Sequence, residues 1–401
     1  MSKHSFIIII LILISNITYS QDTITKRWEL SFSTELELEN QYFASEAIYP
    51  DQMSYFLSAA IKPKFDIAST DGKHVFKVEL FGRVSVQDPN RTHWDIRQAY
   101  YQRKIDSWTI TAGIRRIFWG VSESNHLVDI INQSDVVESS DGSEKLGQTM
   151  VQISKNGTLG NFEFYYLPFS RRIQLPSKTG RNRFPIVLEK EDIPFKSDLE
   201  AWHPGFALRW TKTITDFSLG VSHFYGNSRE PLFLGFNPAS GLDLSYPVIN
   251  QSGIDVQFNK NAWILKLESI YRTSTFQDFI AVTSGFEYTF GNVGGKGLDL
   301  GLVSEYTYDS RKLLTFSGLD NDLFIGSRIA LNDDKSTECL VGGIFDLGKS
   351  TKLFRLEASR RMWSSYKLAV KLNVLVNVSD KEILYNFKND DLLEMKLSKF
   401  F

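Results

Sequence analysis

Hydrophobic and polar residues alternate with a period of two along most of this chain. In residues 28–39, apolar side chains and one threonine occupy the even positions, and polar side chains occupy the odd positions. The same alternation recurs, with few exceptions, in residues 76–84 and 366–376. Because successive side chains of a β-strand point to opposite faces, each segment predicts a strand with one apolar face and one polar face.

About 18 such segments follow one another, joined by connections that alternate between short and, in most cases, longer. The short connections carry turn residues and lie at 70–73, 105–107, 156–158, 215–216, 259–261, 294–297 and 332–335. The long connections lie at 122–147, 168–200 and 227–250, with a shorter one at 310–320. This pattern predicts an all-β fold, a transmembrane antiparallel up-and-down β-barrel of about 18 strands, with 16 as the alternative count. The short turns and both termini are expected on the periplasmic side, and the long loops outside the cell.

A soluble β-sandwich or β-propeller is the alternative fold, because alternation alone does not separate these classes. The segments are longer than the five or six residues usual in soluble sheets and match the roughly 9 to 11 tilted residues that cross a bilayer. Tryptophans at strand ends favour the membrane barrel, since aromatic girdles mark its two interfaces. Those that open strands after a short connection are Trp28, Trp108, Trp263 and Trp363, and Trp210 closes one.

The two ends of the sequence carry export and assembly signals. A basic start, the apolar run 6–14 and small residues before Gln21 predict a cleaved signal peptide over 1–20, so that 21–401 forms the barrel. The run is too short for a spanning helix, and charges interrupt every later apolar stretch. The C-terminal segment alternates and stops at Phe401, which resembles the terminal strand that the barrel-assembly machinery recognises. Location in the bacterial outer membrane is therefore expected, with outer-membrane lipid and lipopolysaccharide as partners.

Composition excludes several other classes of protein. The formal net charge is −2, which becomes −3 without Lys3, and nothing in it favours nucleic acid. Cys339 is the single cysteine, so no intramolecular disulfide forms. We find no phosphate loop, no zinc-protease motif and no nucleophile elbow, and therefore expect no enzyme activity, cofactor or metal. His126 beside Glu123 and Asp129 is the weak candidate for a divalent ion, and an ordinary loop histidine is the favoured interpretation.

If the apolar face meets lipid, the alternate face lines a lumen that carries charges of both signs. A barrel of this size is too wide for side chains alone to fill, so water or a loop must occupy it. Charged rows on the wall would order and select solutes, although pairing between neighbouring strands is an equally good explanation for any one residue. The channel-lining candidates are Glu79, Arg83, Arg97, Arg115, Glu268, Glu305, Arg328 and Arg355.

The segment 113–135 stands out because apolar residues interrupt an otherwise polar loop. Leu127, Val128, Ile130 and Ile131 suit an element folded back into the lumen better than a solvated tip. We therefore expect residues 122–147 to constrict the pore. The candidate residues of this loop are Trp119, Gly120, Glu123, His126, Asp129, Asn132 and Asp135.

The same segment resembles a stretch in a family of Gram-negative outer-membrane β-barrels related to alginate-export and phosphate-selective porin-like proteins. The shared pattern is a strand with glycine, then Trp-Gly, then Asp-apolar-apolar-Asn-Pro-x-Asp. The matching positions are Gly113, Trp119, Gly120, Asp129, Asn132 and Asp135, and Gln133 replaces the proline. Physically, Gly120 permits a sharp turn, and the polar residues are expected to bond loop amides. Pinning of the loop is favoured over direct contact with solute.

Three functions remain open at this point. The leading hypothesis is a porin-like channel for small hydrophilic solutes, in which the arginines hint at anions. The alternatives are a non-conducting scaffold whose charged loop 168–200 binds the surface or another envelope protein, and, from the resemblance alone, a component of polysaccharide export. The sequence leaves homo-oligomerisation open, because lipid-facing and subunit-facing positions look alike.

Overall fold

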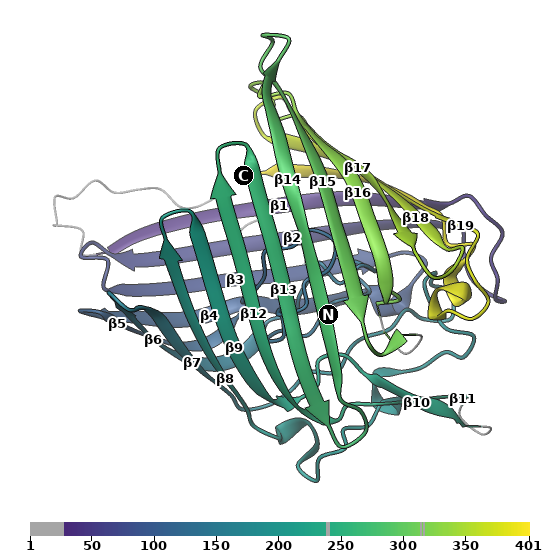
Figure 1. Cartoon of the computed structure of the whole chain (residues 1–401), viewed down its shortest axis with the longest axis horizontal. Coiled ribbons are helices and arrows are strands. Elements are labelled where there is room, and N and C mark those ends of the chain that lie inside the picture. The colour runs from purple at the N-terminus through teal and green to yellow at the C-terminus, as the bar shows by residue number, and fades with distance from the viewer. Residues whose placement is uncertain (1–27, 238–240, 313–314, 316) are drawn as a thin grey trace, which may run out of the picture.

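The computed structural model describes residues 28–237, 241–312, 315 and 317–401 (Figure 1). The expected signal peptide, 1–20, lies outside these residues. The chain forms one closed sheet of 18 strands and a separate two-stranded hairpin, β10 (Leu232–Asn237) with β11 (Gly241–Ser245). Within the described part of the chain, no helix is both long and apolar enough to cross a bilayer.

The barrel follows sequence order and closes between its first and last strands. Its strands are β1 (Trp28–Phe43), β2 (Tyr55–Ser69), β3 (His74–Ser85), β4 (His93–Ile105), β5 (Trp108–Arg115), β6 (Gln148–Gly157), β7 (Gly160–Leu167), β8 (Gly205–Ile214), β9 (Phe217–Asn227), β12 (Val248–Lys260), β13 (Trp263–Ser274), β14 (Phe279–Val293), β15 (Leu298–Asp309), β16 (Asn321–Ala330), β17 (Glu338–Asp346), β18 (Lys352–Met362), β19 (Tyr366–Val376) and β20 (Leu392–Phe400). Neighbours pair antiparallel, β9 pairs with β12, and β20 pairs with β1. The prediction of an 18-stranded antiparallel barrel is therefore confirmed.

Alternation places apolar side chains on the outside of the barrel. Leu30 and Phe32 of β1 are 62% and 44% exposed, although both are strongly hydrophobic. Phe32 pairs in register with Phe65 of β2, and their ring centroids lie 4.7 Å apart. Cross-strand apolar pairs of this kind stabilise a sheet, and their exposure is tolerated because the bilayer is itself apolar. The tryptophans at the turn ends of the strands, including Trp28 and Trp263, lie exposed on this face.

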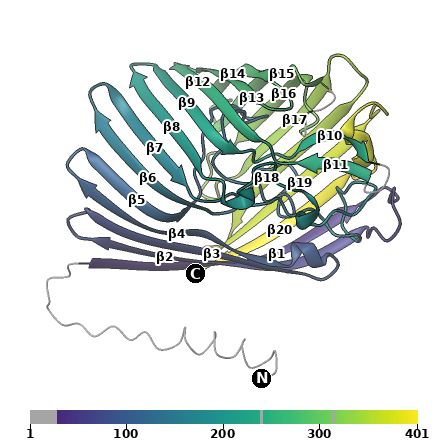
Figure 2. The same ribbon diagram turned by 90° about the horizontal axis from the view of Figure 1, so that it is seen from below.

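Short turns join the strands at one end of the barrel, and long connections join them at the other (Figure 1). Asp106, Thr215 and Asn261 begin two-residue turns in the left-handed region, with φ between 51° and 54°. The long connections are 116–147, 168–204 and 228–247, and Figure 2 shows coil segments within the outline of the barrel. Short 3-10 helices with described bounds lie in the connections, at Pro89–Arg91, Lys190–Asp192, Glu200–Trp202 and Ile383–Phe387.

Two apolar clusters hold the long connections in place. One lies inside the barrel, between the connection 116–147, here called the inner loop, and lumenal side chains of β6–β9 and β12–β14. The other joins segments of 173–195 to Leu244 and Tyr246, with the 3-10 helix Ile383–Phe387 packed against it. Tyr246 is fully buried and its hydroxyl accepts the amide of Ile173 at 2.9 Å. The loops at this end therefore share a core of their own.

The C-terminal residue continues the closing seam. The amide of Phe401 donates to the carbonyl of Thr34 at 3.0 Å, and the amide of Thr34 donates back to Phe401 at 3.3 Å. Recognition of this strand by assembly machinery remains a prediction.

Candidate functional site

One asparagine closes the base of the inner loop. Asn132 Oδ1 accepts the amide of Ile117 at 2.9 Å, and Asn132 Nδ2 donates to the carbonyls of Arg115 and Leu146, each at 2.8 Å. The residue is 1% exposed. A short amide suits this place because it offers a donor and an acceptor to backbone groups at once. The end of β5 is thereby joined to the chain that enters β6.

Asp129 fastens the first part of the same loop. Its Oδ1 accepts the amide of Trp119 at 3.2 Å, and its Oδ2 lies 3.3 Å from Lys145 Nζ. Burial raises the pKa of this carboxyl above its ordinary value, although Lys145 and the Trp119 amide act in the opposite direction. Gly120 has a φ of +133°, and a Cβ there would lie 2.8 Å from Glu268 Oε1. Glycine therefore allows the chain to turn against that carboxylate.

The apolar cluster inside the barrel holds one flank of the loop. Trp119 is 3% exposed, lies edge-on to Tyr165 with ring centroids 5.6 Å apart, and is covered by the guanidinium of Arg209 at 5.0 Å. Other buried members from the loop and the wall are Val128, Ile130, Ile131, Met150, Leu167, Ala207, Phe224, Ile249, Ile270, Phe279 and Ala281. Since each large apolar side chain contributes roughly 1.5–3 kcal/mol on burial, this flank is held as a protein core is held.

Two wall carboxylates bind backbone amides of the loop. Glu268 of β13 accepts the amides of Val121, Ser122 and Val128 at 2.7, 2.9 and 3.2 Å, and the Ser122 hydroxyl at 2.6 Å. Glu305 of β15 accepts the amides of residues 123 and 124, each at 2.7 Å. Hydrogen bonds to an ionised acceptor are the strong ones, and both carboxylates are at most 1% exposed. They replace the water that these amides would otherwise need.

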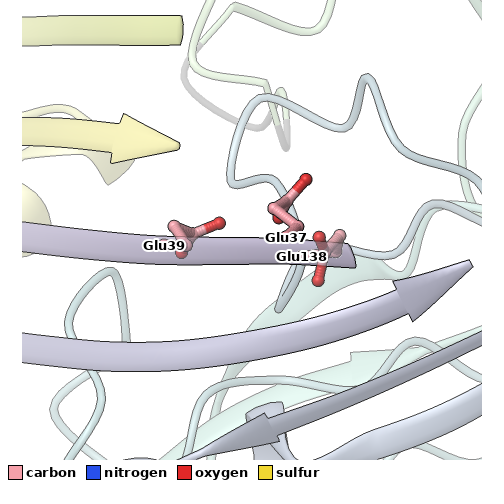
Figure 3. A group of neighbouring side chains, drawn as sticks. All are labelled: Glu37, Glu39 and Glu138. Atoms are coloured by element: carbon pink, nitrogen blue, oxygen red, sulfur yellow. The ribbon is translucent and has the colours of Figure 1, made fainter. Parts of the chain in front are cut away.

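Cations hold the loop on the opposite side of the barrel. Arg83 of β3 makes a two-pronged hydrogen bond to Glu138 of the inner loop, and the same guanidinium reaches Glu37 and Glu39 of β1. Figure 3 shows Glu37 and Glu39 on the strand and Glu138 beside them. Arg91 lies 2.5 Å from Glu39 and donates to the carbonyl of residue 137 at 2.9 Å. The three carboxylates thus sit within a cluster of cations that neutralises them.

A second pair of contacts lies one strand further along the wall. Asp135 of the inner loop accepts from Arg97 Nη2 at 2.6 Å and lies 3.0 Å from His93 Nε2. Burial alone would raise the pKa of Asp135, but the hydrogen bond with His93 and the charge of Arg97 outweigh it, and the pKa lies below its ordinary value. Asp95 accepts the amide of Gly147 at 3.0 Å and pairs with Arg171 of the next long connection at 2.6 Å.

The tip and the front edge of the loop reach two more places on the wall. Asp141 Oδ2 lies 2.5 Å from Lys371 Nζ on β19 and 3.8 Å from Arg355 Nη2 on β18. Glu123 lies 2.7 Å from Arg328 on β16. Contacts on β3–β4, β13–β16 and β18–β19 belong to widely separated parts of the barrel. The inner loop therefore crosses the lumen from wall to wall.

Exposure differs sharply between these contacts. The side chains of Arg83 and Arg97 are 0% and 2% exposed, whereas those of Lys371, Arg355 and Arg328 are 16%, 24% and 39% exposed. A cavity of about 40 Å³ lies between residues 136–140 of the loop, the wall, and Pro176 and Arg181 of the next long connection. A space of this size holds about one water molecule.

The eight channel-lining candidates fall into three groups. Four of them face the lumen but are covered by the inner loop, which they bind: Arg83, Arg97, Glu268 and Glu305. Three remain partly exposed in the lumen: Arg115, Arg328 and Arg355. The last, Glu79, is buried and forms an ion pair with Arg116. His126 lies edge-on to Phe118 at 4.9 Å. In the described chain, the groups of three carboxylates or histidines at ligand distance are Glu37, Glu39 and Glu138, and Asp320, Asp322 and Asp346, so His126 belongs to neither.

Sequence analysis missed three participants of the loop attachment: Glu138, Asp141 and Arg91. The charge of the segment could have pointed to them, because 122–147 holds six acidic residues and one basic residue. In the structure, cations of the wall face these acidic residues. The apolar part of the lumen was likewise not predicted. Tyr165, Tyr166 and Leu167 are apolar on both faces of their strand, which is the mark of a strand covered on both sides.

A closed antiparallel barrel with an apolar outer face, short turns at one end and long loops at the other defines an outer-membrane β-barrel. No protein-family model matches the chain, and no curated protein matches it.

Solved structures match over nearly the whole chain. A BenF-like porin from Pseudomonas fluorescens Pf-5 is similar with a TM-score of 0.54 at 9% identity, covering 93% of this chain and 98% of that one. OpdQ of Pseudomonas aeruginosa is similar with a TM-score of 0.52 at 12% identity, covering 94% and 98%. Wzi of Escherichia coli, described as a carbohydrate-binding β-barrel involved in group 1 capsule assembly, is similar with a TM-score of 0.53 at 10% identity, covering 92% and 83%. At such identities the likeness shows the fold alone. The relation to alginate-export and phosphate-selective porin-like proteins stays a prediction.

Proposed function

We propose that this protein is a porin-like channel of the bacterial outer membrane for small hydrophilic solutes, and that its inner loop sets the width of the pathway. The supporting observation is that the loop crosses the lumen and is attached to opposite walls by ion pairs. Partly exposed charged side chains remain on the wall beside the loop, among them Arg328 and Arg355. Such groups suit a hydrated solute, because they replace part of its hydration shell.

The test is the conductance of the refolded full-length mature chain in a planar bilayer. A second variant replaces residues 122–143 by a short Gly-Ser linker, and the heat-modifiable gel shift verifies that each barrel is folded. We expect small ion-conducting steps from the wild type and much larger steps from the shortened variant. A folded shortened variant that conducts no better than the wild type would overturn the proposed role of the loop.

A second candidate function is a non-conducting barrel whose extracellular loops bind a surface carbohydrate. The observation that favours it is the apolar cluster of Ile173, Phe195 and Tyr246, which ties the extracellular connections together at that end of the barrel. The printed description of Wzi as a carbohydrate-binding barrel belongs to that protein and supplies only the type of ligand to try. A folded wild type that is silent in the bilayer and retains capsular polysaccharide on an affinity matrix would support this function over the channel.

A further inference from the structure

The tip of the inner loop presents one carboxylate to two cations of the wall. Asp141 Oδ1 accepts the hydroxyl of Ser139 at 2.6 Å and the amide of Ser143 at 3.0 Å, which shapes the tip as a tight turn. The other oxygen, Oδ2, is left to face Lys371 and Arg355. The local geometry thus holds Asp141 in the orientation that the two cations require.

The charges around this contact balance only while Asp141 is present. Glu357 of β18 lies 3.2 Å from Lys371 Nζ and 4.0 Å from Arg355 Nε. The two cations and the two carboxylates Glu357 and Asp141 sum to zero, and Glu394, which lies in register with Lys371 on β20, is balanced by Lys396 at 3.1 Å. Without Asp141 this part of the wall retains one positive charge. The place taken by Asp141 therefore suits a single monovalent carboxylate in charge.

The tip is held more weakly than the part of the loop just before it. Glu138 is clamped by Arg83 with both side chains almost fully buried, whereas the side chains of Lys371 and Arg355 remain 16% and 24% exposed. Breaking a buried ion pair is costly, and breaking a partly hydrated one costs far less. Within three residues, the loop thus passes from a buried attachment to a partly hydrated one.

The partly exposed attachment also borders a small cavity. This cavity is lined by Glu138, Ser139 and Ser140 of the loop, by Gln41, Glu394 and Lys371 of the wall, and by Pro176 and Arg181 of the next long connection, among others. Lys371 therefore belongs both to the cavity and to the tip contact. Release of residues 139–143 from the wall would enlarge this space while Glu138 stays in place.

We propose that Lys371 and Arg355 form a binding site for a carboxylate group of the transported solute, and that Asp141 occupies this site until a solute carboxylate displaces it. The proposal rests on the channel function proposed above and adds to it the chemical class of the solute and a self-occupied entry site. Burial alone would raise the pKa of Asp141, but Lys371 and Arg355 outweigh it and hold the pKa below its ordinary value. The carboxylate is thus the charged competitor under ordinary conditions.

The first experiment measures conductance in a planar bilayer at constant KCl, with sodium gluconate added and with sorbitol, its uncharged analogue, at equal concentration. We expect gluconate, and not sorbitol, to raise the mean conductance of the wild type at least about twofold. Asp141→Asn is expected to conduct at the raised level from the start and to ignore gluconate. Lys371→Met should also ignore gluconate. The control Glu144→Gln should behave as the wild type, because Glu144 is partly exposed and pairs with Arg116 within the loop.

A second readout is independent of conduction. Ser140→Cys, placed in a Cys339→Ala background and carrying a nitroxide spin label, reports motion of the tip by electron paramagnetic resonance. We expect gluconate to increase the mobility of the label in the wild-type loop, and Asp141→Asn to show the mobile spectrum without gluconate. An unchanged spectrum under both conditions would overturn the carboxylate site. Silence in the bilayer with a gluconate-sensitive spectrum would instead overturn the channel function and leave the site standing.

Discussion

Arg83 of β3 donates from Nε and Nη2 to the two carboxylate oxygens of Glu138, at 2.7 and 2.5 Å, and neither side chain is more than 4% exposed. The pair joins the wall to the inner loop across 55 residues of sequence. A planar guanidinium fits this two-pronged geometry and an ammonium does not. The directional hydrogen bonds of this pair, as well as its charges, therefore fix the position of the loop in the lumen.

Arg83→Met removes the cation and leaves Glu138, Glu37 and Glu39 with fewer partners. Because an uncompensated buried charge costs about 3–5 kcal/mol, we expect the free energy of unfolding to fall by roughly that amount. Urea unfolding of the barrel in detergent, followed by tryptophan fluorescence, measures it. Arg103→Met is the matched control, since Arg103 is exposed at the end of β4. Equal stability of the two variants would contradict a structural role for the pair.

Glu268→Gln tests the carboxylate that receives the loop amides. Glutamine has one carbonyl oxygen, and its NH₂ group would face donors, so at most part of the four hydrogen bonds survives. Each hydrogen bond to a charged group contributes about 1.5–3 kcal/mol. We expect hydrogen exchange at the amides of Val121, Ser122 and Val128 to accelerate strongly. Glu287→Gln is the control, because Glu287 pairs with Lys266 and Arg328 of the wall, and it should leave these three amides protected.

Gly120→Ala places a methyl group 2.8 Å from the same carboxylate, at a φ of +133°. Both the close approach and the backbone conformation disfavour a side chain. We expect the same accelerated exchange in residues 121–128 as for Glu268→Gln, with the strands still folded. Gly157→Ala serves as the control, since a Cβ there meets nothing within 4 Å. Protection of 121–128 in both glycine variants would show that the turn tolerates a methyl group.

Two aspartates of the inner loop should respond to pH in opposite directions. The pKa of Asp135 is lowered, so its carboxylate stabilises the fold above its ordinary pKa, and this contribution is lost as pH falls through the lowered value. The pKa of Asp129 is raised, so its contribution is greatest at low pH and is lost as pH rises through the raised value. We expect the stability deficit of Asp135→Asn to be larger at about pH 7 than at about pH 3. The free energy of unfolding of Asp129→Asn, measured relative to the wild type, should increase as pH rises from about 3 to about 7. Parallel trends in unfolding free energy would contradict these assignments.

The period-two pattern predicted most of the barrel because the bilayer favours apolar side chains and a hydrated lumen favours polar ones, and the two faces alternate along each strand. Leu30 and Phe32 follow that rule, as does the lumenal series that includes Glu268 and Glu305. The rule assumes a wet lumen. Where apolar residues of the inner loop pack on the wall, as at Tyr165 and Phe279, lumenal positions are apolar as well and the alternation disappears. Glu268 and Glu305 lie under the same loop but remain polar, because they bind its amides.

The sequence alone could not predict which charged residues pair with one another. Asp141 and Lys371 lie 230 residues apart in the chain, and the signs of charge alone allow many other pairs. Each pair depends on strand tilt and register, which place Arg355 and Lys371 side by side on the wall. The polar side chains of Asp129 and Asn132 indicated that the loop would be attached through its own amides, but not which cations would contact its tip.

The attachment of the inner loop has a consequence for how the protein is made. The loop lies between the fifth and sixth strands of the barrel, yet Lys371 of β19 contacts it, and Lys396 of β20 lies 3.2 Å from Glu39 of β1 beside Arg83. One cluster of charges therefore joins the inner loop, through Glu138, to both strands of the closing seam. Attachment of the loop and closure of the ring stabilise each other, so that folding of the lumen and folding of the wall are coupled.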